Sequence, residues 1–184
     1  YNPGNYNAYI TRGGFDYLYD KVGLYDYLKL VLQGKKPASG ITNCWQSVND
    51  IQDKMLNFLE NHDEQRLASD FFLGEPMKAL PALAVSLLLN RSPFMIYFGQ
   101  ELGERGMDSE GFSREDGRTS IFDYWSVSTI RGWFKGKYDT NLRLLYKQIL
   151  NLSINEKTFR LSSTYDLEYA NLENTDFNPA FHYA

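Results

Sequence analysis

The sequence predicts an α/β fold in which parallel strands are covered by helices. Two short runs, Met55–Leu59 and Phe94–Phe98, are almost wholly apolar and show no alternation of polar and apolar residues, which is typical of strands buried on both faces. Segments with helical spacing separate these runs, so that three strand and helix units follow one another along the chain. This order favours a parallel sheet with helices packed against it.

The first unit is expected from Phe15–Asp20, a run of aromatic and apolar residues that predicts a strand before a turn. Asp26 is a plausible N-cap for the helix that follows, and Gly34 should end that helix. A second helix is predicted over Asn43–Lys54, after a loop that contains Pro37. Its apolar residues share one face: Trp45, Val48 and Ile51.

The next two units contain the two apolar strands. Pro76 is well placed for the first turn of a helix over Met77–Asn90. Pro81 removes a backbone donor inside this pattern, so either a late helix start or a kink is expected. The long polar loop Gly99–Thr119 follows the last strand, and loops of this length in compact domains are usually functional.

A further helix is predicted from the leucine-rich segment Leu142–Leu152. Beyond it the pattern changes to period two, because Tyr165, Leu167 and Tyr169 alternate with acidic residues. This change predicts an antiparallel domain. The expected domains are therefore residues 1–158 and residues 159–184.

Composition and charge exclude several classes of protein. The 184 residues are 43% hydrophobic, which is enough for one ordinary domain with a core. A formal net charge of -4 offers no basic surface for a phosphate backbone, so nucleic acid is not an expected partner. No apolar run approaches the roughly 20 residues that a bilayer-spanning helix needs. A membrane span is therefore not expected.

The single cysteine, Cys44, has no second cysteine for an internal disulfide or a zinc site, so it does not indicate a cellular compartment. The chain opens at Tyr1 without an initiator Met or a signal segment, which predicts that it is a piece of a longer protein. Localisation therefore stays open, with a secreted or cell-envelope location as the candidates.

The densest group of polar side chains follows the strand Met55–Leu59. Glu60, Asn61, His62 and Asp63 stand there, two of them carboxylates. Ligands bind at the carboxyl ends of parallel strands because the loops converge at that edge, which makes this cluster a candidate site. The alternative is a capped strand end in which these side chains only hold loops.

The order of several segments resembles the α-amylase family of glycoside hydrolases. Phe58–Asp63 resembles the end of the seventh barrel strand in that family, and Tyr97–Gly103 resembles the eighth strand with its loop. Gly117–Tyr124 is similar to the segment that follows, and Phe15–Asp20 fits the sixth strand. The resemblance implies a partial (β/α)8 TIM barrel, roughly strands six to eight with their helices, followed by the start of an antiparallel β-domain.

The resemblance also implies a function, which is retaining hydrolysis of α-glucans such as starch and maltooligosaccharides. Asp63 would be the carboxylate that stabilises the transition state, and His62 would bind the same sugar unless it is a structural imidazole. Arg66 would steady the loop or reach a neighbouring subsite. The family's nucleophile and acid/base belong to the fourth and fifth strands, which this chain does not contain, so the chain alone should be inactive.

Other carboxylates receive no catalytic role. Glu101 is expected to shape the site or to be structural, and the remaining ones should form a solvated loop face: Asp108, Glu110, Glu115 and Asp116. No cofactor and no metal ligand are assigned, although calcium is common in the family and is possible in the parent protein.

An α-glucan is the expected ligand, and open sheet edges should make the chain associate with itself. Two alternatives remain, a non-catalytic interaction domain and a starch-binding module. The intact Asn61-His62-Asp63 triplet argues against the first of them.

Overall fold

The computed structural model describes residues 2–89, 91–123, 127–137, 141–161 and 163–184. Tyr1, Asn90 and Tyr124, which the sequence analysis uses, lie outside these ranges. The chain divides into two compact units, and each is described by itself. Unit 1 comprises Tyr1–Asn57, Val85–Phe94 and Glu156–Ala184, and unit 2 comprises Phe58–Ala84 and Met95–Asn155.

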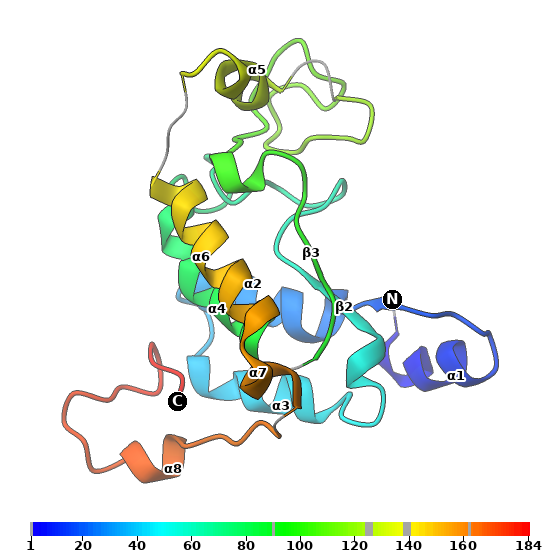
Figure 1. The fold of residues 1–184 in the computed structure, drawn as a ribbon, viewed down its shortest axis with the longest axis vertical. Helices are drawn as coiled ribbons and strands as arrows, with labels where there is room; N and C mark the ends of the chain where they lie inside the picture. The colour runs from blue at the N-terminus through cyan, green and yellow to red at the C-terminus, as the bar shows by residue number, and fades with distance from the viewer. Residues whose placement is uncertain (1, 90, 124–126, 138–140, 162) are drawn as a thin grey trace. The chain divides into compact units, whose positions relative to one another are not determined.

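Most of the regular structure is helical (Figure 1). The α-helices are α1 (Tyr6–Thr11), α2 (Asp26–Leu32), α3 (Ile41–Gln46), α4 (Leu80–Leu88), α5 (Ser128–Phe134), α6 (Asn141–Asn155), α7 (Lys157–Leu161) and α8 (Glu168–Asn171). Short 3₁₀ helices are η1 (Pro3–Asn5), η3 (Ala38–Gly40), η4 (Gln52–Lys54), η5 (Pro76–Ala79) and η6 (Gln100–Leu102), and η2 (Lys21–Tyr25) is a π-helix.

A small sheet of three strands has the order β1 (Leu18–Tyr19), β2 (Met55–Phe58) and β3 (Phe94–Met95). β1 and β2 are parallel, with Leu18 opposite Met55. The Asn57 N–H donates to the Pro93 carbonyl at 2.9 Å, which connects β2 to the chain that enters β3. β2 and β3 both end where the chain passes from unit 1 into unit 2.

The predicted partial (β/α)8 barrel, strands six to eight with their helices, is wrong. The described chain is largely helical, and its only sheet is the short one above. Phe15–Asp20 forms a strand over Leu18–Tyr19 alone, and the Phe15 side chain is exposed. After β3, the Tyr97 N–H donates to the Gln100 side chain at 3.1 Å and the Gln100 N–H donates to the Tyr97 carbonyl at 2.9 Å. These local bonds use backbone groups that a longer strand would need for its ladder.

The predicted antiparallel β-domain is also wrong. Residues 159–184 contain the end of α7, then α8 and turns, and no strand occurs among the described residues of that range. Tyr165 and Tyr169 are 77% and 73% exposed, so the period-two pattern does not mark a buried face. The Asp166 side chain instead accepts the Glu168 N–H at 2.7 Å, just where α8 begins. The predicted domain boundary between residues 158 and 159 stays a prediction.

Helix boundaries follow the local signals more closely. The helix α2 is confirmed, and Gly34 follows it with a left-handed φ of 68°. The predicted N-cap is wrong, because Asp26 is the first residue of α2 and Tyr25 occupies the N-cap position. Of the two alternatives predicted from Pro81, a late helix start or a kink, the structure has the late start. η5 precedes α4, and Pro81 occupies the first turn of α4, where its missing N–H is not needed. The helix predicted over Asn43–Lys54 is shorter than expected, since α3 ends at Gln46.

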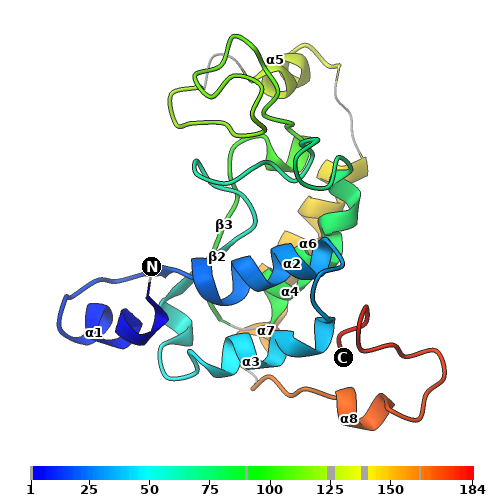
Figure 2. The ribbon, with the colours of Figure 1, turned by 180° about the vertical axis from the view of Figure 1, so that it is seen from behind.

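The core of unit 1 contains Tyr6, Val48, Ile51 and Met55, with Leu18 packed against it. α2 and α3 contact each other, as the view from behind also shows (Figure 2). The C-terminal segment is attached to α3 and the turn before it. The Trp45 indole donates to the Tyr183 hydroxyl at 2.9 Å, and several backbone and side-chain bonds extend this contact: Ala38 N–H to the Ala180 carbonyl, Ser39 N–H to the Pro179 carbonyl, and Thr42 with Asp166 and Tyr183.

In unit 2, α6 and α5 both contact η6. The segment between η6 and α5 carries no helix or strand in its described part and runs beside α5 in both ribbon views. Among the described residues, no helix combines the length and apolar character needed to cross a bilayer.

Candidate functional site

A buried ion pair lies directly behind the predicted site residues in unit 2. Arg66 and Glu60 are 0% and 1% exposed, and the Arg66 Nη1 lies 2.5 Å from the Glu60 Oε2. The other Glu60 oxygen accepts the Leu67 N–H at 2.7 Å. The Glu60 carboxylate therefore holds the two ends of the loop 60–67 together.

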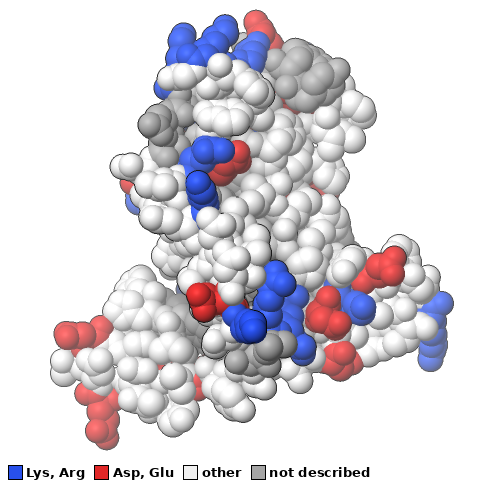
Figure 3. Space-filling view, viewed as in Figure 1, with Lys and Arg blue, Asp and Glu red and all other residues white. Residues whose placement is uncertain are grey.

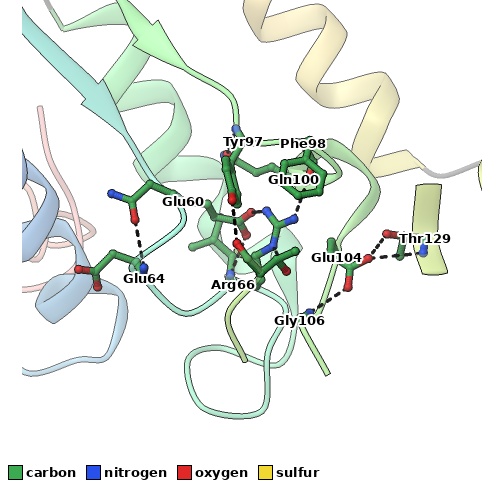
Figure 4. A network of polar contacts seen from close by, with 12 residues as sticks. Glu60, Glu64, Arg66, Tyr97, Phe98, Gln100, Glu104, Gly106 and Thr129 are labelled. Carbon is green, nitrogen blue, oxygen red and sulfur yellow. Dashed lines mark hydrogen bonds and ion pairs between the residues drawn. The ribbon is translucent and has the colours of Figure 1, made fainter. Parts of the chain in front are cut away.

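Arg66 also connects this loop to two other segments (Figure 4). Its Nη2 donates to the Phe98 carbonyl at 2.5 Å, and its Nε donates to the Thr119 hydroxyl at 3.0 Å. The Arg66 backbone N–H donates to the Gly117 carbonyl at 2.6 Å. The guanidinium lies 4.7 Å from the centre of the Tyr97 ring, whose hydroxyl donates to the Thr119 carbonyl at 2.7 Å. One side chain thus fixes three stretches of chain.

The electrostatics of this cluster follow from its burial. Burial raises the pKa of the Glu60 carboxyl above its ordinary value, and the Arg66 charge and the Leu67 N–H oppose that change. Burial likewise raises the pKa of the Tyr97 hydroxyl to about 12, with Arg66 opposing it. Tyr97 therefore stays a neutral hydrogen-bond donor at physiological pH.

Asn61 shapes the backbone that carries Asp63. Its side-chain oxygen accepts the Asp63 N–H at 2.8 Å and the Glu64 N–H at 3.0 Å, and the residue is buried. This is an Asx turn, in which a short amide side chain replaces a backbone acceptor. The turn holds residues 62 and 63 in a fixed backbone conformation above the buried Glu60.

His62 and Asp63 lie together at the surface. Their side chains are 44% and 62% exposed, and the His62 Nε2 lies 3.5 Å from the Asp63 Oδ2. Arg66, four residues from His62 in the chain, is by contrast fully buried. Of the two roles considered for Arg66, steadying the loop agrees with this placement.

Arg118 is a neighbour of the site that the sequence analysis did not assign. Its backbone N–H and its Nε donate to the two Asp116 carboxylate oxygens at 2.9 and 2.8 Å. The hydrogen bonds that Arg118 donates to Asp116 raise the pKa of its guanidinium, as does the charge of Asp116. The charge of Asp63 raises this pKa further. The charge of Asp63 therefore acts on Arg118. In the chain, Arg118 lies between Gly117 and Thr119, whose oxygens accept hydrogen bonds from Arg66.

The sequence does contain a signal for this arrangement, in Gly117. Its φ is +81°, and a Cβ there would come within 2.9 Å of the Ser69 Oγ and of a Phe71 ring carbon. Only glycine fits, because the turn is left-handed and the loop from residue 66 lies close to it.

The remaining loop carboxylates have partners or stand at the surface. Asp108 lies 3.2 Å from an Arg131 nitrogen, and Glu104 is buried, where it accepts the Gly106 N–H at 2.9 Å and bonds to Thr129. Glu101 is half-buried in η6. No group of His, Cys, Asp and Glu that could hold a metal ion occurs in the described ranges, and calcium stays an expectation for the parent protein.

Comparison with models of known protein families found no match, and comparison with curated protein sequences found none either. A functional assignment therefore depends on the chemistry of the residues described above.

Proposed function

We propose that this chain supplies the transition-state-stabilising carboxylate, Asp63, of a retaining glycoside hydrolase that acts on α-glucans such as starch and maltooligosaccharides. The observation that carries the proposal is the exposed His62 and Asp63 pair on a loop held from below by Glu60, Asn61 and Arg66. The proposal depends on this loop and on the order of the resembling segments, and it requires no barrel within the chain.

The chemistry of the pair suits a sugar ligand. Glycoside hydrolysis passes through a flattened, positively charged oxocarbenium-like transition state, and a fixed carboxylate stabilises that charge more than it stabilises the neutral ground state. The imidazole of His62 can donate a hydrogen bond to a ring hydroxyl. Arg118, held by Asp116, stands between Gly117 and Thr119, the two residues whose oxygens Arg66 binds, and offers a second donor group beside this loop.

Asp63 does not form the covalent intermediate in this proposal. A retaining mechanism needs two further carboxyl groups about 5–5.5 Å apart, one as nucleophile and one as acid/base. The resemblance assigns both to segments of the family that precede those matched here. Full activity would therefore belong to the parent protein.

The test replaces Asp63 with Asn in the full-length protein and measures release of reducing sugar from starch. Turnover should fall by about a thousandfold, because Asn keeps the shape but loses the charge that stabilises the transition state. Folding should be retained, since the side chain is 62% exposed. Circular dichroism checks that point.

Asp70→Asn is the matched control, because that carboxylate is also in unit 2 and is 60% exposed in its pair with Arg105. Unchanged turnover in the Asp63 variant would sink its assignment. A wild-type protein that binds maltooligosaccharides but releases no sugar would point instead to a starch-binding module, and one that does neither would point to a non-catalytic interaction domain.

A further inference from the structure

A cavity in unit 2 has no role in the proposed hydrolysis. Its volume is about 490 Å³, within the range of roughly 300–1,000 Å³ that is usual for small-molecule sites. Ile96, Phe98 and Leu150 supply its apolar walls, and Tyr146 lies between them. The Tyr146 hydroxyl already accepts a hydrogen bond from Gln100 at 3.0 Å, so the phenol presents mainly its ring to the cavity.

The polar part of the lining carries a surplus of positive charge. Arg143 and Lys147 both line the cavity and are exposed, and Glu101 and Asn151 complete the polar lining among the described residues. Arg143 and Lys147 are four residues apart on α6, so their side chains lie on the same face one turn apart. Figure 3 shows basic side chains over α6 beside an acidic one, surrounded by uncharged surface.

Arg143 is oriented before any ligand arrives. Its guanidinium carbon lies 5.0 Å from the centre of the Trp133 ring, a cation–π arrangement that restricts a long side chain. A guanidinium can bind a carboxylate, phosphate or sulfonate group through two parallel N–H donors, and one that is already held against a ring loses less rotamer freedom on binding.

We propose that this cavity binds an amphiphilic monoanion, a molecule with one acidic group on an apolar body. The acidic group would lie between Arg143 and Lys147, and the body would pack against Ile96, Phe98 and Leu150. Glu101 disfavours a second negative charge. A neutral sugar suits the apolar part of the cavity poorly, because Ile96, Phe98 and Leu150 offer its hydroxyls no hydrogen bonds in place of water.

The site is separate from His62 and Asp63. One residue connects the cavity to the Arg66 network. Phe98 lines the cavity, and its carbonyl accepts a hydrogen bond from Arg66. The inference does not depend on glycosidase activity, and its test uses binding alone.

The test titrates the chain with anilinonaphthalene sulfonate, a fluorescent aromatic monoanion, and compares two double variants. Arg143→Gln with Lys147→Gln should raise the Kd at least about tenfold, because both charge-assisted contacts are lost. Arg105→Gln with Lys78→Gln changes the net charge of unit 2 equally, at surface residues paired with Asp70 and Glu75, and should change the Kd by less than about twofold. Leu150→Ser should weaken binding through the apolar wall.

Competition identifies the ligand class. Phenylbutyrate should displace the dye, whereas phenylbutanol, its neutral analogue, should need an at least about tenfold higher concentration for the same displacement. Inorganic phosphate should not compete. Three results overturn the proposal: no dye binding by the wild type, equal weakening in the two double variants, or equal competition by the acid and the alcohol. Circular dichroism of each variant confirms that folding is retained.

Discussion

Two ion pairs of a carboxylate with an arginine, each formed by residues close together in the sequence, contribute to the candidate site, and they differ most in burial. In the Glu60 and Arg66 pair the side chains are 2% and 0% exposed, whereas in the Asp116 and Arg118 pair they are 38% and 46% exposed. The Gly117 carbonyl, which accepts the Arg66 N–H, lies between Asp116 and Arg118 in the chain. The Glu60 and Arg66 pair therefore stabilises the fold, whereas the Asp116 and Arg118 pair can still contact a ligand.

The difference follows from solvation. A buried ion pair loses the hydration of both charges, so it persists only where further hydrogen bonds satisfy the remaining donors and acceptors. Arg66 has these in the Phe98 and Thr119 oxygens, and Glu60 has one in the Leu67 N–H. An exposed pair keeps most of its water, and its attraction is screened. Disrupting the first pair should therefore affect folding, and disrupting the second should affect mainly the site.

The largest effect is expected from Arg66→Ala. This change leaves the Glu60 carboxylate buried without a counter-charge and frees two oxygens on other segments, so the free energy of unfolding should fall by about 3–5 kcal/mol. Urea unfolding followed by circular dichroism measures it. Arg105→Ala, which removes an arginine that is 55% exposed, is the control and should cost less than about 1 kcal/mol. Equal costs for the two variants would mean that burial does not distinguish these arginines.

A smaller effect is expected from Glu60→Gln. The glutamine amide keeps one oxygen that can accept a hydrogen bond. The substitution removes the negative charge beside Arg66, and it places an NH₂ group where the second oxygen accepted a hydrogen bond. The expected cost is roughly 1.5–3 kcal/mol, the range for hydrogen bonds to charged groups. The same urea titration measures it. If Glu60→Gln lowered the free energy of unfolding as much as Arg66→Ala, the result would contradict the expectation that the bonds of Arg66 to three segments stabilise the fold more than the Glu60 carboxylate does.

The smallest effect is expected from Asp116→Asn, and it should depend on pH. Partial burial acts to raise the pKa of the Asp116 carboxyl, but the hydrogen bonds from Arg118 outweigh it, and the pKa lies below its ordinary value. A lowered folded pKa contributes stability that is present above the unfolded pKa of about 3.9 and is lost as the pH falls through the folded pKa. At neutral pH the difference from wild type should be about 0.2–1 kcal/mol, because the pair is exposed and screened.

Unfolding of wild type and the Asp116 variant at pH values from neutral to strongly acidic measures this contribution. The two stability curves should converge below the ordinary carboxyl pKa. A difference that stays constant through the acidic range would contradict the assignment to the Asp116 charge.

Parts of the site could be predicted from local sequence. The cluster after the apolar strand located Asp63 and His62, because an abrupt change from apolar to polar residues marks the end of a buried strand. Arg66 was named, but its burial was not foreseen. Its partners lie 32 and 53 residues further along the chain, at Phe98 and Thr119, and no local pattern indicates such a pairing. Arg118 was missed because its relation to Asp63 joins segments that are far apart in the sequence, although its own partner, Asp116, is close by.

The fold shows the same limit. Helix starts and stops at Gly34 and Pro81 follow from backbone chemistry within one turn, and they were predicted correctly. Strand length was overestimated, because apolar runs form long strands only where neighbours pair with them. The turn closed by Gln100 and the bond from Asp166 to α8 satisfy the backbone locally instead. A resemblance of segments to a family therefore did not predict the arrangement of the chain.

The tryptophans offer an optical consequence of the division into units. Trp45 belongs to unit 1, where its indole is buried and donates to Tyr183, while Trp133 belongs to unit 2, where it is 37% exposed beneath Arg143. Indoles in such different surroundings emit at different wavelengths. A variant in which Trp45 is the only tryptophan would report on unit 1 by fluorescence, and a variant without Trp45 would report on unit 2. The melting of one unit could then be timed against that of the other.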